Sequence, residues 1–394
     1  MRIEIPRYTE RFGSVRINDV QRVLELDSGV KTEAPCKEAI AIYKADEKQL
    51  EDIQGRMAII LPIKDEKLKL FEGVLSGIPH SCLIIAVSNS QREPIDRFRM
   101  EQDALKQFCH FTQREALIIH QKDPVIAQAI EEAKYPELLD EDGLVRDGKC
   151  EGMLMGILLA MLCGKDYVGF IDTDNYIPGA VWEYVKSYAT GFSLARSPYT
   201  MVRMLWRYKA SVSEGIYFRK WGRVSRIVNR HFNRLISTQT GFETEIIKTA
   251  NSGEHAMSIG LAKMLTYASG YAVEPQELIS IFEQFGGILP PAHKEVIEQG
   301  VDIFQIESRN LHIHEERGSE HIDEMLLVGL ANLYHSPLSG PEDKRLILEE
   351  LEAGGYLKPG EELAQPHYYP PPEKADLEKF ARVMREYFLE YSVS

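Results

Sequence analysis

Short apolar runs alternate with segments of helical periodicity from Met57 onward. The runs "MAIILPI", "SCLIIAVSNS" and "ALIIHQ" are short enough for buried strands, and segments with helical spacing of apolar residues follow them: "KLKLFEGVLSGI", "IDRFRMEQDALKQFCHF" and "DPVIAQAIEEA". Strands in alternation with helices are typical of a mostly parallel sheet with helices on both faces. The pattern therefore predicts an α/β fold.

A fourth apolar run, "DYVGFIDTDN", ends in two aspartates, Asp172 and Asp174. It follows "GKCEGMLMGILLAMLCG", whose apolar stripe predicts a helix packed on the sheet. In open α/β sheets ligands bind beyond the carboxyl ends of the strands. The two carboxylates are therefore expected at the edge of the sheet where such folds bind their ligands.

The remainder of the chain predicts further helices after Gly241, a strand-like segment "NLHIHEE" and a final amphipathic helix. The final helix falls in "PPPEKADLEKFARVMREYFLEY", where the proline run should separate it from what precedes. We expect one α/β domain over residues 1–250 with an N-terminal extension, and a helical C-terminal region over residues 251–394.

The composition excludes several classes of protein. A formal charge of −14 and a pI near 5.4 argue against a general nucleic-acid binder. The five cysteines are scattered and never form a Cys-x-x-Cys pair, which indicates reduced thiols. Neither a secretory signal nor a membrane span is recognisable. We expect a soluble, cytoplasmic protein, and a homodimer through the C-terminal helices is a further hypothesis.

One segment, residues 195–240, reverses the overall charge. It holds ten lysines or arginines and a single acid, Glu214, for a local charge of +9. Such a segment can bind a phosphorylated ligand, because arginine pairs bidentately with phosphate and carboxylate. Part of it is expected to be an ordinary solvated helix surface.

Two aspartates separated by one residue at a strand end can converge on one Mg²⁺ or Mn²⁺ ion. The alternative is structural, since aspartate is common in turns, where it bonds the local backbone. Context favours the metal site, because two desolvated carboxylates repel each other unless a cation or hydrogen-bond donors compensate.

Two enzyme classes place Asp-x-Asp after an apolar strand. Phosphatases of the haloacid-dehalogenase type usually carry the motif at the start of the domain, whereas here about 170 residues precede it. Nucleotide-sugar transferases of the GT-A type place it after about four strands, as here. Walker A, Gly-x-Gly-x-x-Gly and His-Glu-x-x-His motifs are absent from the sequence.

Candidate donor-binding residues follow the first and second of these strands. Pro62, Lys64 and Glu66 in "LPIKDE" resemble the opening nucleotide-binding loop of such transferases, and Asn89 lies in "VSNS". Lys149 begins a helix, where the dipole favours an anion and disfavours a cation. A phosphate ligand would resolve that conflict; a solvated lysine beside Asp147 is the alternative.

The combination "LPIKDE", "RDGKCEGMLMG", "FIDTDNYIPG", "ARSPYTMVRMLWR", "NSGEHAMS" and "NLHIHEERG" resembles the mannosyl-3-phosphoglycerate synthase family over essentially the whole chain. The resemblance implies a GT-A fold, that is, a Rossmann-like mostly parallel sheet flanked by helices, with a helical C-terminal extension. Residues 1–250 would then be the domain that binds the nucleotide sugar, and residues 251–394 the acceptor-side region. It implies transfer of mannose from GDP-mannose to 3-phosphoglycerate with retention of configuration, for synthesis of the compatible solute mannosylglycerate. It also implies a divalent cation, Mg²⁺ or another such as Mn²⁺ or Co²⁺.

The resemblance also implies roles for individual residues. Asp174 is expected to ligate the metal, while Asp172 lies nearer the nucleotide and Thr173 occupies the variable middle position. A distant histidine should complete the metal site. Alternation in "NLHIH" puts His312 and His314 on one strand face, and of the two we favour His314.

Glu254 in "NSGEHAMS" resembles an acidic residue near the sugar or acceptor, although the first turn of a helix would also favour an acid. For the acceptor we select Arg196, Thr200 and Arg203, because they follow the strand-like run "FSLA" and should lie at the same sheet edge as the aspartates. The sequence leaves open a front-face or a double-displacement mechanism.

Three other functions remain possible at this stage. A related transferase with another donor or acceptor, such as glucosyl-3-phosphoglycerate synthase, would use the same parts. An Asp-x-Asp phosphatase would hydrolyse a phosphomonoester. A non-catalytic nucleotide-sugar or RNA-binding protein would use the basic segment.

Overall fold

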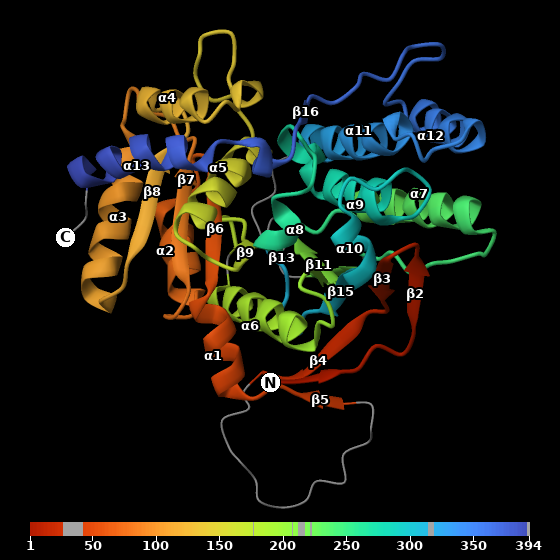
Figure 1. Ribbon diagram of the computed structural model, residues 1–394, viewed down its shortest axis with the longest axis horizontal. Helices are drawn as coiled ribbons and strands as arrows, with labels where there is room; N and C mark the ends of the chain where they lie inside the picture. The colour runs from red at the N-terminus through yellow and green to blue at the C-terminus, as the bar shows by residue number, and fades with distance from the viewer. Residues whose placement is uncertain are drawn as a thin grey trace, which may run out of the picture.

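Within the part of the chain that the structure describes, twelve strands form a single mixed sheet (Figure 1). The computed structural model describes residues 1–26, 42–175, 177–206, 208–211, 217–220, 223–313 and 319–391. The strands of this sheet are β1 (Arg2–Glu4), β2 (Thr9–Phe12), β3 (Val15–Asn18), β4 (Gln21–Glu25), β5 (Ile42–Lys44), β6 (Met57–Ile63), β7 (Leu83–Ser88), β8 (Ala116–His120), β9 (Tyr167–Phe170), β10 (Thr200–Leu205), β13 (His255–Ser258) and β15 (Val301–Glu307).

The helices cover the sheet and extend beyond one end of it (Figure 1). They are α1 (Glu47–Gly55), α2 (Leu68–Gly77), α3 (Arg97–Thr112), α4 (Pro124–Glu132), α5 (Lys149–Leu162), α6 (Pro178–Leu194), α7 (Arg223–Thr240), α8 (Ile259–Ala262), α9 (Val273–Phe285), α10 (Lys294–Gln299), α11 (Ser319–His335), α12 (Pro341–Ala353) and α13 (Leu377–Tyr391). Two small sheets pair β11 (Tyr208–Ser211) with β12 (Tyr217–Lys220), and β14 (Tyr267–Ala268) with β16 (Tyr368–Tyr369). None of the described helices combines the length and the apolar character that crossing a membrane requires.

Strand β6 shows why these sequences form a sheet with two covered faces. Ala58 and Ile60 belong to the core beneath α5, whereas Ile59 and Leu61 belong to the core formed with α1, α2 and α6. Successive side chains of a strand point to opposite faces, so a strand covered on both faces is apolar throughout. The predicted α/β class and the four predicted strands β6 to β9 are confirmed.

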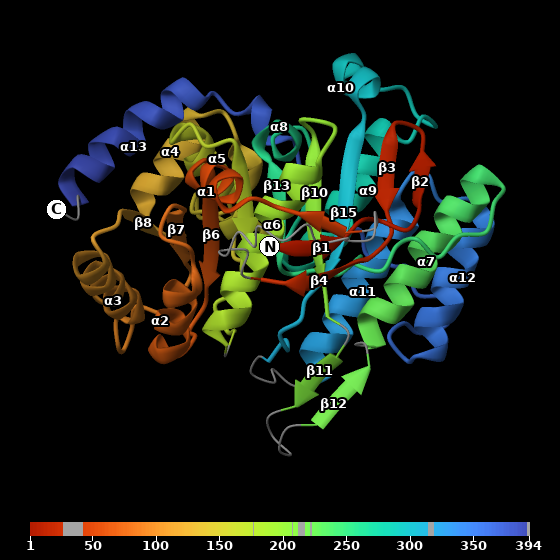
Figure 2. The ribbon, with the colours of Figure 1, turned by 90° about the horizontal axis from the view of Figure 1, so that it is seen from below.

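The strand order is β5-β1-β4-β15-β10-β13-β9-β6-β7-β8, with β3 joined to β15 and β2 to β3. Strand β13 runs antiparallel between β9 and β10, while β10 is parallel to β15. The carboxyl ends of β6, β7, β9, β10 and β15 therefore meet the amino end of β13 at one edge. Figure 2 shows this edge as the end with β11 and β12, which follow β10, opposite α10, which precedes β15.

The predicted division at residue 250 separates strands of this one sheet, because β13 and β15 belong to the second range. The N-terminal extension also joins the sheet, where β3 and β4 pair with β15. The predicted final helix is present as α13, which lies against α4 through an ion pair of Arg382 with Glu132.

One predicted strand is wrong, and another is described only in part. The run "FSLA" is the end of helix α6, which continues to Leu194, and β10 begins only at Thr200. Of the segment "NLHIHEE", residues 310–313 lie beyond β15, which ends at Glu307, and only His312 among them makes a strand-like bridge; residues 314–316 lie outside the described ones. A run of about four apolar or mixed residues is too short to tell a strand from the end of a helix by sequence alone, because its long-range partners decide.

Candidate active site

The two aspartates lie in the loop that follows β9, at the carboxyl edge of the sheet. Strand β9 ends at Phe170, and the N–H of the next residue, Ile171, still donates to the Ile60 carbonyl of β6. The buried Thr173 hydroxyl donates to the Pro62 carbonyl at 3.0 Å and so ties this loop to the end of β6. Asp172 and Asp174 remain half-exposed on either side of Thr173. The loop thus presents two carboxylates beside the predicted donor-binding strand.

Lys149, the first residue of α5, lies against these carboxylates. Its Nζ is 2.7 Å from Asp172 Oδ1 and 2.9 Å from Glu274 Oε1, and its side chain is only 14% exposed. Burial alone would lower the pKa of Lys149, but the negative charges of Asp172 and Glu274 raise it well above the usual lysine value. The ammonium therefore stays charged at the carboxyl edge.

Gly253 allows this close approach. A Cβ at that position would lie 2.8 Å from Asp172 Oδ2 and 3.4 Å from Lys149 Nζ. A side chain at this position would require the Asp172 carboxylate to shift. The Gly in "NSGEHAMS" therefore lets the backbone pass close to the ion pair of Asp172 with Lys149.

Glu254, at the amino end of β13, reaches the same place from the neighbouring strand. It is 1% exposed, and Oε1 accepts a hydrogen bond of 2.9 Å from Asn175 Nδ2. The same amide group donates to the Asp172 carbonyl at 2.8 Å. Burial, and then the charge of Asp172, raise the pKa of Glu254 to about 8, while Asn175 and Lys149 oppose the rise. Three carboxyl groups, those of Asp172, Glu254 and Glu274, thus gather around the ammonium group of Lys149, which compensates part of their charge.

The raised pKa predicts a pH-dependent stability for the metal-free protein. Between pH 4.5 and about 8 the folded protein holds a proton on Glu254 that the unfolded chain has released. The free energy of unfolding should therefore fall as the pH rises through this window, by a few kcal/mol at most. Urea unfolding at several pH values should show this fall in the native sequence and a flatter profile in Glu254→Gln. Identical profiles for both proteins would contradict the assignment.

The predicted donor-binding residues lie at the same edge. Lys64, which is exposed, and Glu66 follow β6, and the Lys64 N–H donates to Glu66 Oε2 at 2.5 Å. Asn89 follows β7, and its Nδ2 donates to Asp147 Oδ1 at 3.1 Å, in the loop before Lys149. The structure brings these residues to neighbouring strand ends, as the sequence predicts.

The predicted acceptor residues do not share this edge. Thr200 is the first residue of β10, so it and the exposed Arg196 lie at the amino end of that strand, opposite the aspartates. The Arg196 N–H donates to Asp302 Oδ2, and the Thr200 hydroxyl donates to the Ser197 carbonyl. The premise that placed them beside the aspartates is wrong, because the chain before β10 is helical.

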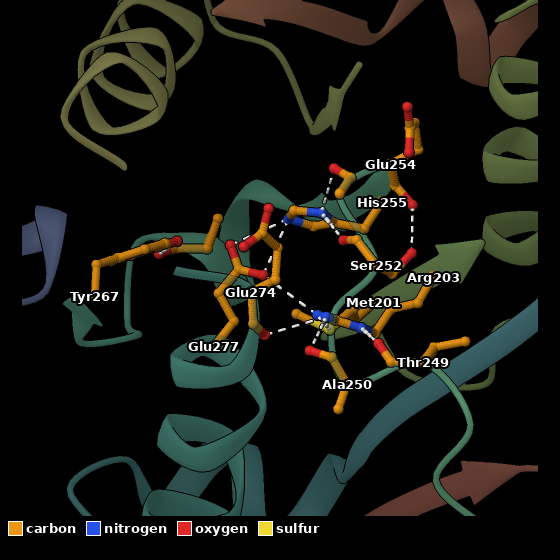
Figure 3. A network of polar contacts seen from close by, with 12 residues as sticks. Met201, Arg203, Thr249, Ala250, Ser252, Glu254, His255, Tyr267, Glu274 and Glu277 are labelled. Carbon is orange, nitrogen blue, oxygen red and sulfur yellow. Dashed lines mark hydrogen bonds and ion pairs between the residues drawn. The ribbon is translucent and has the colours of Figure 1, made fainter. Parts of the chain in front are cut away.

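Arg203 lies within β10 with its side chain fully buried (Figure 3). Its Nε donates to the Thr249 carbonyl at 2.8 Å, and Nη2 donates to the carbonyls of Ala250 and Glu274 at 3.0 and 3.1 Å. Nη1 pairs with Glu277 Oε2 at 3.3 Å, also fully buried. These contacts take up the donors that an acceptor phosphate would need. Arg203 instead fastens the segment that leads to Glu254.

His255 joins the same network from β13. Its Nε2 lies 3.0 Å from Glu277 Oε2, and its Nδ1 faces the Ser252 carbonyl at 3.0 Å (Figure 3). Strand pairing sets Arg203 opposite His255, and His255 opposite Phe170. The buried network therefore connects α9 to the two strands beside the Asp-x-Asp loop.

Four of the ten basic residues of the segment lie on α7, and two of these form ion pairs with another helix. Arg230 pairs with Glu350, and Arg234 lies 3.3 Å from Asp343, both acids of helix α12. The side chains from residue 207 to residue 223 lie outside the described ones. Acids of α12 therefore neutralise part of the positive charge predicted for this segment.

His312 is buried near the site, whereas His314 lies outside the described residues. The His312 ring stacks on Trp206 with centroids 4.2 Å apart, just after β10 and β15 end. Among the described residues, no three His, Cys, Asp or Glu groups come together as a metal cluster. The chain beyond β15 nevertheless returns to the edge where the aspartates lie.

Two residues of this site were not predicted as functional. Glu274 lies 125 residues from Lys149, and no local pattern distinguishes it from other acids in a first helical turn. Asn175 stands within the quoted motif "FIDTDNYIPG", where an amide directly after Asp-x-Asp is the signal that could have found it.

Known proteins of one family match this chain over nearly its whole length. The family described as mannosyl-3-phosphoglycerate synthase matches residues 5–384. The chain is 46% identical to the mannosyl-3-phosphoglycerate synthase of Pyrococcus furiosus, over 98% of this chain and 97% of the relative. It is 38% identical to the enzyme of that name from Aeropyrum pernix, over 98% of each chain.

Solved structures show the same fold at low sequence identity. Glucosyl-3-phosphoglycerate synthase from Mycobacterium tuberculosis in complex with phosphoglyceric acid aligns with a TM-score of 0.51 and 17% identity, over 84% of this chain and 96% of the other. The same enzyme with Mn²⁺, UDP-glucose and phosphoglyceric acid aligns with a TM-score of 0.51 and 19% identity, over 84% and 95%. The predicted GT-A fold is thereby confirmed.

Proposed function

The chain belongs to the mannosyl-3-phosphoglycerate synthase family, and from this premise we propose that it transfers mannose from GDP-mannose to 3-phosphoglycerate. The products are mannosyl-3-phosphoglycerate, a precursor of mannosylglycerate, and GDP. The observation that carries the proposal is the meeting of Asp172, Lys149 and Glu254 at the carboxyl edge of the sheet. The ammonium group of Lys149 can compensate the negative charge of a diphosphate, and carboxyl groups can accept hydrogen bonds from sugar hydroxyl groups.

We infer that the donor lies over the ends of β6, β7 and β9. The loop from Pro62 to Glu66, together with Asn89, would contact the nucleotide, and Thr173 keeps the Asp-x-Asp loop against β6. Lys149 begins α5, so its ammonium and the helix N-terminus both face the diphosphate. Because Asp172 and Glu274 keep this lysine charged, it can stabilise the charge that develops on the leaving diphosphate.

Mg²⁺ and Mn²⁺ prefer oxygen ligands such as the two carboxylates of the Asp-x-Asp loop. We propose Asp174 as a ligand, with Asp172 nearer the nucleotide and a histidine of "NLHIH" completing the site. The related fold of the mycobacterial enzyme holds Mn²⁺ with UDP-glucose, which supports this choice. When bound, such a cation would neutralise the diphosphate and aid its departure.

In the proposed reaction the bond from mannose C1 to the diphosphate oxygen breaks, and the electron pair leaves with GDP. The 2-hydroxyl of 3-phosphoglycerate forms the new bond to C1 from the same face, which gives retention, and its proton passes to the departing phosphate. Glu254 lies close to Asp172 through Asn175, so its carboxyl group can bind a sugar or acceptor hydroxyl. A covalent route would instead require a carboxylate beneath C1.

Purified protein incubated with Mg²⁺, 3-phosphoglycerate and each of GDP-mannose, GDP-glucose and UDP-glucose tests the proposal. GDP-mannose should give the fastest transfer, and EDTA should abolish it. Preference for a glucosyl donor would favour the glucosyl-3-phosphoglycerate synthase alternative. Release of phosphate without transfer would indicate a phosphatase.

The two histidines can be separated by variants. We expect His314→Ala to raise the Mg²⁺ concentration needed for half-maximal activity strongly, because a ligand is lost. His312→Ala should raise it less, since that ring stacks on Trp206. A titration of activity against Mg²⁺ checks the ranking, and the reverse order would identify His312 as the ligand.

A further inference from the structure

The loop after β6 contains a left-handed turn at Asp65, with φ of 62°. This region is uncommon for residues other than glycine, although aspartate adopts it more readily than most. Backbone strain of this kind persists only where the surroundings hold it, and it gathers at functional sites. Here the turn lies between Lys64 and Glu66, both predicted to contact the donor.

Three groups hold the turn from the adjacent strand end and helix. The Asp65 N–H donates to Ser90 Oγ at 2.8 Å, and Asp65 Oδ1 accepts the Gln91 N–H at 2.9 Å. Arg97, the first residue of α3, donates Nη2 to the carbonyls of Asp65 and Glu66 at 3.0 and 2.7 Å. The backbone of the turn is therefore fixed along its whole length.

Glu101 lies beneath these contacts, one turn further along α3, and is 1% exposed. Its two carboxylate oxygens accept the hydroxyl groups of Ser88 and Ser90, each at 2.6 Å. Because the Ser90 hydroxyl proton is directed to Glu101, a lone pair of the same oxygen faces the Asp65 N–H. A buried carboxylate is costly unless it is fully bonded, so this one fixes the serine orientation closely.

We propose that Glu101 and Ser90 are positioning residues for the donor nucleotide, acting by holding the left-handed turn at Asp65. The proposal rests on the proposed function, since it takes the segment from Lys64 to Glu66 as the nucleotide contact. Both side chains are buried, so we expect neither to contact the donor. The effect of their loss should therefore appear in nucleotide affinity and not in the acceptor KM.

The first test measures the Kd for GDP by calorimetry with Mg²⁺ present. Ser90→Ala should weaken GDP binding about 5- to 20-fold, because the Asp65 N–H loses its partner. Glu101→Gln retains one acceptor oxygen, so it should weaken GDP binding less than Glu101→Ala does. Ser76→Ala is the matched control, since Ser76 is exposed and bonds only the Gly73 carbonyl of its own helix. The KM for 3-phosphoglycerate should stay within about twofold in Ser90→Ala.

A second pair of variants isolates the backbone. Asp65→Ala and Asp65→Gly remove the same side chain, but only glycine adopts the left-handed region without strain. Asp65→Ala should therefore bind GDP about five- to tenfold more weakly than Asp65→Gly. Equal Kd values for these two folded variants would overturn the role of the turn.

The outcomes distinguish this inference from the proposed function. If the native protein binds GDP and Ser90→Ala binds it equally well, the positioning role is overturned while the proposed function stands. If the native protein does not bind GDP in the presence of Mg²⁺, the proposed function fails, and this inference fails with it.

Discussion

Asp174→Asn should lower kcat for mannosyl transfer by roughly 1000-fold, while the protein keeps its fold. Removing one group that stabilises transition-state charge typically costs about 10² to 10³ in rate, and loss of a metal ligand lies at the upper end of this range. Asp174 is half-exposed and asparagine has nearly the same size and shape as aspartate, so we expect the substitution to leave the fold intact. The Kd for GDP should change far less than kcat, because other groups still contact the nucleotide.

The matched control is Asp103→Asn, the same chemical change at an exposed position of α3. It should retain native kcat and native Mg²⁺ dependence. Asp174→Asn with native activity would remove this residue from the catalytic site. Equal losses in kcat and GDP affinity would mean that Asp174 binds the nucleotide ground state.

Arg203→Ala should lower the free energy of unfolding by about 3 to 5 kcal/mol, a large share of the stability of an ordinary domain. The substitution leaves the Glu277 carboxylate buried with its main cationic partner gone, and it removes the donors to three carbonyl groups. Urea denaturation measures the loss. The exposed Arg196→Ala is the control and should change stability by less than about 0.5 kcal/mol.

A double variant keeps this prediction testable if Arg203→Ala does not fold. Arg203→Met with Glu277→Leu removes both charges and retains side-chain volume, so it should recover part of the lost stability, while His255 Nε2 loses its partner Glu277. Native stability in Arg203→Ala, together with a raised KM for 3-phosphoglycerate, would contradict the structural role. It would restore the acceptor-binding role that the sequence suggested.

The parts of the fold that depend on local pattern were predictable. Strands β6 to β9 are apolar because each is covered on both faces, and the helices between them carry their own periodic stripes. The insertion of β13 between β9 and β10 was not predictable, and neither was the pairing of β3 and β4 with β15. Those contacts join segments far apart in the chain, and no local signal records them.

The residues of the site also divide into those that a local pattern reveals and those that it does not. The Asp-x-Asp motif and Lys149 could be found because their positions at a strand end and a helix start follow from the pattern, whereas Glu254 was selected only through the family resemblance. Arg203 was assigned wrongly because a positive charge in the sequence does not reveal burial, and its partner Glu277 lies 74 residues further on. Glu274, which keeps Lys149 charged, escaped prediction for the same reason.

The most direct test of the proposed function is a ³¹P and ¹H NMR time course of the purified protein with Mg²⁺, GDP-mannose and 3-phosphoglycerate. We predict that GDP appears in equal amount to a new phosphomonoester, whose mannose is joined at the 2-oxygen of glycerate with the anomeric configuration of the donor. Formation of GDP and free mannose without the new phosphomonoester would contradict the account.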